Sequence, residues 1–277
     1  MMNCFQLIKT VLDEAYAAIP GNDKAKDTSI NAALDELSRE YADLLSKGCV
    51  DYSDPCKRYA YIFKYTTSHA NIVYTIIRRS SHLRSLFDRD KLTVACVGGG
   101  PGSDFLGILK YCMQDEKHPE LKALILDRDS AWSESWSDVD DKIGPSFRIS
   151  TNFQPLDVTD PSSWKTYTKH FNADLFSLIY FMSELYAVRK KAQDYFESLF
   201  SNMKPGAIIL FVDNNSSAFR DWFDTLASEC GISIDESDEI DAQMPSDEEK
   251  KDLGEHFVKF GSPKLTANIA FRIGVKT

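Results

Sequence analysis

The stretch LTVACVGGGPGSD, Leu92–Asp104, decides how the rest of the chain can be arranged. Leu92–Val97 is short, nearly uncharged and rich in β-branched residues, which predicts a strand buried on both faces. Four glycines and a proline follow, and Ser103 and Asp104 can then cap a helix. Glycines let the backbone approach a ligand closely, and the free N–H groups at a helix N-terminus favour polar or negative groups. The stretch therefore predicts a cradle for a nucleoside-bearing ligand.

The spacing of the glycines narrows the choice of ligand. Counted from Gly98, the sixth position is Ser103, so the G-x-G-x-x-G pattern of dinucleotide-binding folds is not met. The pattern G-x-G-x-G stands there instead, and it resembles motif I of the class I S-adenosylmethionine (SAM)-dependent methyltransferases. In that family the loop packs against the methionine and ribose parts of SAM. The resemblance implies cofactor contacts from the loop and from the acid just past it, namely Gly98, Gly99, Gly100, Pro101, Gly102 and Asp104.

Length, composition and net charge limit the classes of protein to which this chain can belong. The chain has 277 residues, of which 43% are hydrophobic and 27% charged, and its length is enough for one large domain or for one domain with an appendage. It has no apolar run near the ~18 residues of a membrane span, and its N-terminus lacks the apolar core of a signal peptide. The net charge of −10 makes nucleic acid an unlikely partner, because phosphate binding needs a positive field. We therefore expect a cytoplasmic protein with a small-molecule or protein substrate and no membrane association.

The cysteines point to the same compartment. None of the six forms a C-x-x-C pair, so they are expected to be reduced thiols, and no metal site is expected. They are Cys4, Cys49, Cys56, Cys96, Cys112 and Cys230.

Residues 1–91 contain no convincing strand and predict a helical appendage. Asp27-Thr28-Ser29 can cap a helix with an apolar stripe that includes Tyr41 and ends at Gly48. A longer helix is predicted from Asp54 to about Arg79. Because it is apolar on more than one side, we expect it to be buried against the SAM-binding domain, residues 92–277. In methyltransferase-like proteins such a layer commonly closes over the substrate.

One face of that longer helix carries candidate substrate-contacting residues. Tyr61, Tyr65 and His69 stand at i, i+4 and i+8 and so share a face. The two tyrosines are predicted to serve catalysis. The alternative is that they are packed aromatic residues, and for His69 a satisfied buried histidine is the favoured interpretation.

The next predicted strand, Ala123–Leu126, ends at an acid, Asp127. A carboxylate there can accept hydrogen bonds from both ribose hydroxyls, and the resemblance assigns this position the same role. Asp127 lies 25 positions beyond Gly102, close to the ~20 expected of a β-α-β unit. Arg128 is expected to contact the cofactor as well, whereas Asp129 competes with Asp127 for the ribose or caps the next helix.

The adenine is expected to lie near the third strand, predicted weakly over Phe147–Asp157. Asp157 resembles the position that reads the adenine amino group, and Val158 offers a backbone N–H beside it. Leu156 can pack on the ring, while Asp160 competes as the head of a turn.

The helix predicted over Ser130–Ile143 also carries candidate adenine-contacting residues. It carries Trp132 and Trp136, of which one can stack on the adenine. The alternative is that both cover the sheet.

The fourth strand, predicted over Ala173–Met182, leads to a candidate catalytic residue, Glu184. By the resemblance, the carboxyl end of this strand faces the methyl group. Neither the N/D-P-P-Y/F nor the Pro-Cys signature of DNA base methyltransferases stands here. Glu184 is therefore a candidate general base or amine-binding carboxylate, with Tyr180 and Tyr186 as neighbours. Tyr186 is a further candidate catalytic residue. Equally, Glu184 can simply open the next helix.

The rest of the chain completes the pattern. Lys204-Pro205-Gly206 before an apolar strand resembles the entry to the fifth strand of class I methyltransferases. A short strand near Ile232–Ile234, a solvated acidic loop over Asp235–Asp252 and a terminal strand over Ala267–Val275 follow. The expected fold is α/β, with a seven-stranded, mostly parallel Rossmann-like methyltransferase sheet whose last strand is antiparallel, and an N-terminal helical layer.

One position departs from the family. The acid that usually stands two residues before the first glycine, and holds the amino group of the methionine moiety, is Cys96 here. Asp104 is a candidate substitute. The sequence predicts SAM-dependent methyl transfer to oxygen or nitrogen of a small molecule or protein side chain. A non-catalytic SAM-binding protein and an aminopropyl- or aminobutyl-transferring synthase of the same fold remain alternatives.

Overall fold

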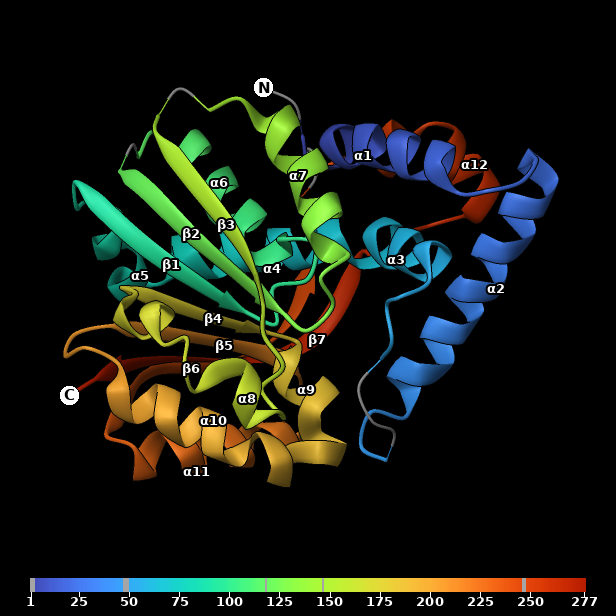
Figure 1. The fold of residues 1–277 in the computed structure, drawn as a ribbon. Helices are drawn as coiled ribbons and strands as arrows, with labels where there is room; N and C mark the ends of the chain where they lie inside the picture. Colours follow the sequence, from blue (N-terminus) through green and yellow to red (C-terminus); the bar gives the residue numbers. More distant parts are fainter. Residues whose placement is uncertain (1–2, 47–49, 118, 146, 246–247) are drawn as a thin grey trace.

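A seven-stranded sheet runs through the centre of the protein (Figure 1). The computed structural model describes residues 3–46, 50–117, 119–145, 147–245 and 248–277. The strands follow the order β3-β2-β1-β4-β5-β7-β6, and β7 runs antiparallel to both of its neighbours while β1 to β5 are parallel. They are β1 Lys91–Val97, β2 Glu120–Asp127, β3 Ile149–Pro155, β4 Leu175–Ile179, β5 Ile208–Asn214, β6 Ile232–Gln243 and β7 Thr266–Lys276. The predicted fold class is confirmed.

Helices cover both faces of this sheet (Figure 1). They are α1 Cys4–Ala18, α2 Asp23–Ala42, α3 Pro55–Tyr61, α4 Thr67–Arg79, α5 Ser81–Leu86, α6 Ser103–Gln114, α7 Trp132–Ile143, α8 Pro161–Trp164, α9 Phe181–Leu185, α10 Arg189–Asn202, α11 Ser217–Glu229 and α12 Glu255–Phe260. Four of them, α4 to α7, contribute to the core on one face, and α8, α10 and α11 contribute to the core on the other.

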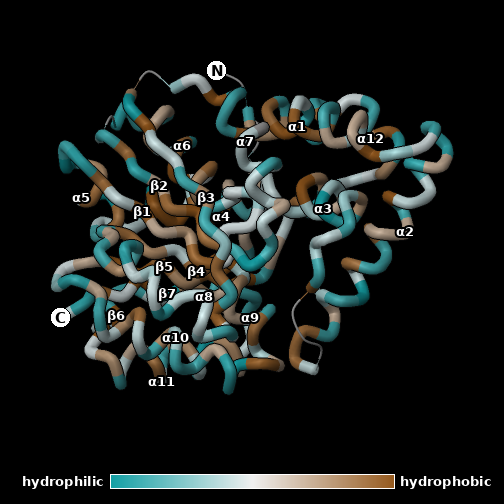
Figure 2. Tube along the Cα trace, viewed as in Figure 1, coloured by the Kyte–Doolittle hydropathy of each residue, from teal (hydrophilic) through white to brown (hydrophobic). Residues whose placement is uncertain are grey.

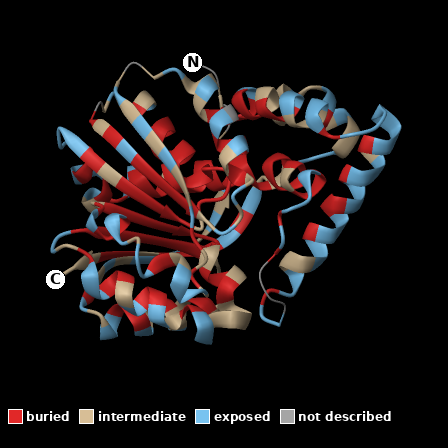
Figure 3. Cartoon of the chain, viewed as in Figure 1, coloured by how far each residue is buried: buried red, intermediate tan, exposed pale blue. Residues whose placement is uncertain are grey.

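Alternate residues of the central strands face opposite sides of the sheet, where they pack into two separate hydrophobic cores. In β1, Val94 and Cys96 face the core under α4 and α6, whereas Ala95 and Val97 face the core under α10. This two-sided burial explains why the strand reads as a continuous apolar run. Figure 2 shows hydrophobic stretches in the central strands, and Figure 3 shows these strands mostly buried.

The N-terminal helices form a layer at the carboxyl edge of the sheet (Figure 1). The helix predicted from Asp54 is continuous through a π-helical turn, Ile62–Thr66, which joins α3 to α4. The N-cap of α2 is Asn22, whose side chain accepts from the amide of Ala25, so the prediction that Asp27-Thr28-Ser29 caps this helix was wrong. Gly48 lies outside the described residues.

A late segment of the chain joins this layer. The short helix α12 lies beside α1 (Figure 1), where His256 Nε2 is 2.8 Å from a carboxylate oxygen of Asp13. The hydroxyl of Tyr59 is 2.6 Å from Nδ1 of the same histidine. The layer that covers the carboxyl edge is therefore built from both ends of the sequence.

Helix α6 begins differently from the prediction. Its N-cap is Gly102, with φ +84°, and no side chain caps it, so Ser103 and Asp104 do not have the predicted capping role. A Cβ at Gly102 would lie 2.1 Å from the ring of Trp136, which fills the space where a capping side chain would stand. Asp104 turns inward instead, toward Ser177 on β4.

Two strand predictions also need correction. The fourth strand stops at Ile179, because Tyr180 adopts a left-handed conformation with φ +56° and turns the chain into α9. The acidic loop predicted over Asp235–Asp252 is a strand in its first half, since β6 continues to Gln243 and pairs with β7 apart from an irregularity at Asp235. β6 is the edge strand of the sheet, so its acidic side chains stay in water and discourage pairing with other chains.

Among the described residues, no helix is both long and apolar enough to cross a membrane. The five cysteines within the described ranges are all free thiols, and Cys49 lies outside those ranges. The same ranges contain no group of three acidic, histidine or cysteine side chains arranged to hold a metal ion.

Candidate active site

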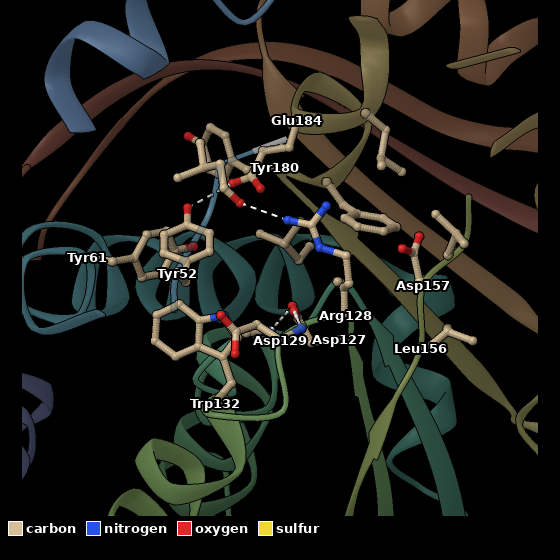
Figure 4. Close-up of a pocket in the computed structure, with 17 residues that line it drawn as sticks. Tyr52, Tyr61, Asp127, Arg128, Asp129, Trp132, Leu156, Asp157, Tyr180 and Glu184 are labelled. Carbon is tan, nitrogen blue, oxygen red and sulfur yellow. Dashed lines mark hydrogen bonds between the residues drawn. The ribbon is translucent and has the colours of Figure 1, made fainter. Parts of the chain in front are cut away.

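The pocket lies at the carboxyl ends of strands β1 to β4 (Figure 4). In the sheet, β1 has β2 on one side and β4 on the other, so the chain direction of the crossovers reverses here, and open α/β sheets bind ligands at such a point. The space between its lining side chains is about 650 Å³, a volume that includes the part open to solvent. It is lined by Val50, Tyr52, Tyr61, Gly98, Gly100, Asp127, Arg128, Asp129, Trp132, Leu156, Asp157, Val158, Ile179, Tyr180, Phe181, Glu184 and Leu185.

The glycine loop forms the floor at the end of β1. Gly98 and Gly100 have φ values of +70° and +48°, which L-residues with side chains rarely adopt. A Cβ at Gly98 would lie 2.1 Å from the Phe181 ring, so only glycine fits. The structure brings these two glycines to the pocket, but it does not place Gly99, Pro101 or Gly102 among the lining residues.

Asp127 stands where the ribose was predicted. One carboxylate oxygen accepts a hydrogen bond from the amide of Gly100 and the other from the amide of Asp129, both at 3.0 Å. Burial raises the pKa of this carboxyl to about 6. Asp129 also lines the pocket, but one of its oxygens accepts from the amide of Ala131 at the start of α7. Both acids therefore line the site, and Asp127 is the one that is hydrogen-bonded to the glycine loop.

Arg128 links the sheet edge to the N-terminal layer. Its guanidinium donates a 3.1 Å hydrogen bond to the carbonyl of Val50, as the dashed line in Figure 4 shows. The side chain therefore connects the end of β2 to the segment before α3. A cofactor contact from this residue was predicted, and its place in the lining is compatible with that role.

The residues after β3 line the next part of the pocket. A carboxylate oxygen of Asp157 accepts from the amide and hydroxyl of Thr159 at 2.8 and 2.7 Å, which fixes the turn. Within the described residues, the backbone N–H of Val158 has no acceptor. Leu156 lies beside them. This part of the pocket offers one free donor, one carboxylate and an apolar surface.

The two tryptophans of α7 separate in the structure. Trp132 lines the pocket, and its ring lies 5.0 Å from that of Tyr52. Trp136 packs under the loop against Gly102 and Phe105, and does not line the pocket.

Glu184 closes the pocket at the end of β4 and is held by two phenols. Its Oε1 accepts from the hydroxyl of Tyr41 at 2.6 Å and from that of Tyr52 at 3.3 Å, and the two hydroxyls are 2.5 Å apart. Burial raises the pKa of this carboxyl to about 7, and the nearby carboxyl of Asp127 adds to the rise. Glu184 is therefore poised to exchange a proton near neutral pH.

Sequence reasoning missed Tyr52 and the role of Tyr41. Tyr41 belongs to the apolar stripe of the predicted second helix, and a core role accounts for that position equally well. Tyr52 lies in a loop with no periodic pattern. The only sequence signal for this pair was that Tyr41 stands before the predicted end of a helix and Tyr52 stands after it.

The predicted tyrosine face is divided by the structure. Tyr61 lines the pocket, while Tyr65 packs behind it with ring centroids 5.4 Å apart. His69 stacks on Tyr180 at 4.2 Å, and burial lowers its pKa to about 3, so it remains neutral. Tyr186 is not brought to this site, because its ring packs against Phe219 on α11.

The acid beneath the loop comes from α6. Asp104 is buried, and its carboxylate accepts a 2.5 Å hydrogen bond from the hydroxyl of Ser177. Ser177 is the neighbour of Cys96 in the β1–β4 ladder. Burial raises the pKa of Asp104 to about 7. The carboxyl thus lies beside Cys96, but Asp104 does not line the pocket and the structure does not give it a contact with a ligand.

No known family model matches the sequence, and no curated protein matches it. Solved structures of similar fold include a SAM-dependent methyltransferase from Methanosarcina mazei, with 11% identity, TM-score 0.47 and coverage of 71% of this chain and 97% of the other. The CurJ carbon methyltransferase has 11% identity and TM-score 0.49 over 91% and 68% of the two chains. Precorrin-6Y C5,15-methyltransferase from Geobacter metallireducens has 10% identity and TM-score 0.45 over 72% and 87%.

The fold class rests on the molecule's own architecture. The strand order, the antiparallel β7 and a glycine loop between β1 and α6 define a class I, Rossmann-like SAM-dependent methyltransferase fold. The pocket lies at the switch point of that fold.

Proposed function

We propose that the protein is a SAM-dependent methyltransferase that acts on oxygen or nitrogen of a small molecule or a protein side chain. The observation that carries this proposal is the sequence of groups along one sheet edge. From β1 through β2 to β3, the pocket offers a glycine floor, the carboxylate of Asp127 and the free N–H of Val158. These suit the methionine, ribose and adenine parts of SAM in that order.

The residues present fit this cofactor. The floor at Gly98 leaves no room for a side chain, and Asp127 can still accept hydrogen bonds from ribose hydroxyls, because each carboxylate oxygen has two lone pairs. Asp157 and Val158 would hold the adenine edge. When bound, SAM supplies an already activated methyl group, so the protein has mainly to orient an acceptor and exclude water.

The chain's own residues meet those two requirements. The N-terminal layer contributes Val50, Tyr52 and Tyr61 to the lining and covers the pocket. Glu184, with its pKa near 7, would take a proton from an acceptor that begins protonated. In this role Tyr41 and Tyr52 are positioning residues, because they hold the carboxylate and do not take the proton.

The ribose assignment predicts a difference between two adjacent acids. Asp127→Ala is expected to weaken SAM and S-adenosylhomocysteine binding by about tenfold or more, since it removes charged hydrogen bonds worth about 1.5–3 kcal/mol each. Asp129→Ala should have a smaller effect, and equilibrium dialysis with labelled SAM measures both. If Asp129→Ala proved the more damaging change, the ribose would belong to Asp129.

A SAM-binding protein without catalysis is the second candidate. It is favoured by the position of Asp104, which lies beside Cys96 under the loop and does not line the pocket. The family's usual contact to the methionine amino group is therefore lacking among the lining residues of the described chain. Tight SAM binding without turnover over a panel of metabolites and proteins would favour this candidate.

A further inference from the structure

The pocket has more acidic than basic side chains, and Glu184 is the acid at its β4 end. Four acids line the pocket, Asp127, Asp129, Asp157 and Glu184, against the single basic residue Arg128. Throughout the described part of the chain, no basic side chain forms an ion pair with Glu184. Ionising a half-buried carboxylate that has no ion-pair partner costs free energy, unless a ligand supplies the opposite charge.

An aromatic surface adjoins the same carboxylate. We call the rings of Tyr52, Tyr61 and Trp132 the aromatic wall, and their centroids lie 5.0–5.5 Å apart. All three residues line the pocket, and Figure 4 shows Tyr52 between Glu184 and Trp132. The faces of such rings attract cations.

Glu184 and Tyr180 also have unused hydrogen-bonding capacity. Only Oε1 of Glu184 accepts hydrogen bonds, which leaves Oε2 for a ligand. Tyr180 lines the pocket and is 5% exposed, and its hydroxyl has no hydrogen-bond partner among the described residues. A polar ligand at this end of the pocket would satisfy both groups.

The order of strands separates this end from the proposed cofactor position. The cofactor groups lie along β1, β2 and β3, whereas Glu184 follows β4, on the other side of β1. The unpaired charge of Glu184 is therefore on the side from which an acceptor would approach the methyl group.

Building on the proposed function, we propose that the methyl acceptor is an amine that binds as an ammonium ion against Glu184 and the aromatic wall. The ammonium nitrogen gives one proton to Oε2 of Glu184, and its freed lone pair forms the new N–C bond to the methyl carbon. The C–S bond breaks, its electron pair stays on sulfur, and the sulfonium becomes a neutral thioether. The product leaves as a methylated ammonium ion, and Glu184 returns its proton to solvent.

Tetramethylammonium tests the cation site without requiring turnover. Protein saturated with S-adenosylhomocysteine, and protein without it, would be titrated with tetramethylammonium chloride and with uncharged tert-butanol at constant ionic strength, using saturation-transfer NMR. We expect at least tenfold tighter binding of the cation than of the alcohol. Glu184→Gln should weaken cation binding by at least tenfold and leave S-adenosylhomocysteine affinity within about twofold of wild type.

The controls distinguish this inference from the function on which it rests. Glu229→Gln changes an exposed acid on α11 and should leave cation binding unchanged. Equal binding of cation and alcohol, or unchanged cation binding in Glu184→Gln, would overturn the amine inference alone. Failure of the wild-type protein to bind S-adenosylhomocysteine would overturn the proposed function.

Discussion

Replacing Glu184 with glutamine is expected to stabilise the protein above neutral pH. Burial raises the pKa of this carboxyl from an ordinary 4.5 to about 7, so the folded state disfavours the ionised form. That penalty is absent below the pKa of the unfolded chain, grows as the pH rises toward 7, and is constant above it. Because one pKa unit corresponds to about 1.4 kcal/mol, the variant should gain roughly 3 kcal/mol at pH 8 and roughly 1 kcal/mol at pH 5.

Urea denaturation at the two pH values measures this difference. Glutamine keeps an oxygen that can accept from Tyr41, so the hydrogen bond to the N-terminal layer survives the substitution. Glu229→Gln on the surface serves as the matched control and should change stability little at either pH. A stability difference for Glu184→Gln that is the same at pH 5 and pH 8 would show that this carboxyl is not held in a costly ionised state.

Replacing Lys110 with methionine is expected to destabilise the fold by about 3–5 kcal/mol, because it leaves a buried carboxylate without its partner. Lys110 on α6 lies 2.5 Å from Glu248, and the two side chains are 6% and 1% exposed. The ammonium of Lys110 also donates a hydrogen bond to Asn71, and the ammonium nitrogen lies 4.8 Å from the centroid of the Tyr74 ring. The pair ties the segment before α12 to the sheet domain.

The double variant Lys110→Met/Glu248→Leu separates the pair from its surroundings. Removing both charges should recover most of the lost stability, because a buried ion pair contributes little over an apolar pair of similar volume. Thermal and urea unfolding of the two single variants and the double variant complete the cycle. A loss below 1 kcal/mol in Lys110→Met would mean that Glu248 finds water or another partner when the lysine is gone.

The sheet and the cofactor side of the pocket were predictable because their signals are local. The apolar run before Gly98, the glycine loop and the acid at Asp127 are contiguous patterns whose geometry the backbone dictates. The structure brings Gly98, Asp127 and Val158 to one edge, because parallel strands end on the same side.

The acceptor side was less predictable because tertiary packing creates it. Tyr41 and Tyr52 are 11 positions apart, yet both reach Glu184, 132 positions or more further along the chain. No local pattern encodes such a meeting. Tyr186 shows the converse, since it stands two residues after Glu184 and turns away to pack against α11.

Edge strands mislead sequence reasoning for a related reason. β6 carries acidic residues that predict a solvated loop, yet its backbone pairs with β7 along the strand, apart from an irregularity at Asp235. Pairing on one side satisfies the backbone, while the charged side chains remain in water.

Calorimetric titration of the wild-type protein with SAM, S-adenosylhomocysteine and NAD tests whether the pocket binds SAM. We expect micromolar binding of both sulfur nucleosides and no binding of NAD, because the loop at Gly98–Gly102 has the spacing that resembles the methyltransferase motif and not the dinucleotide spacing. Absence of binding by both sulfur nucleosides, or tight binding of NAD in their place, would contradict it.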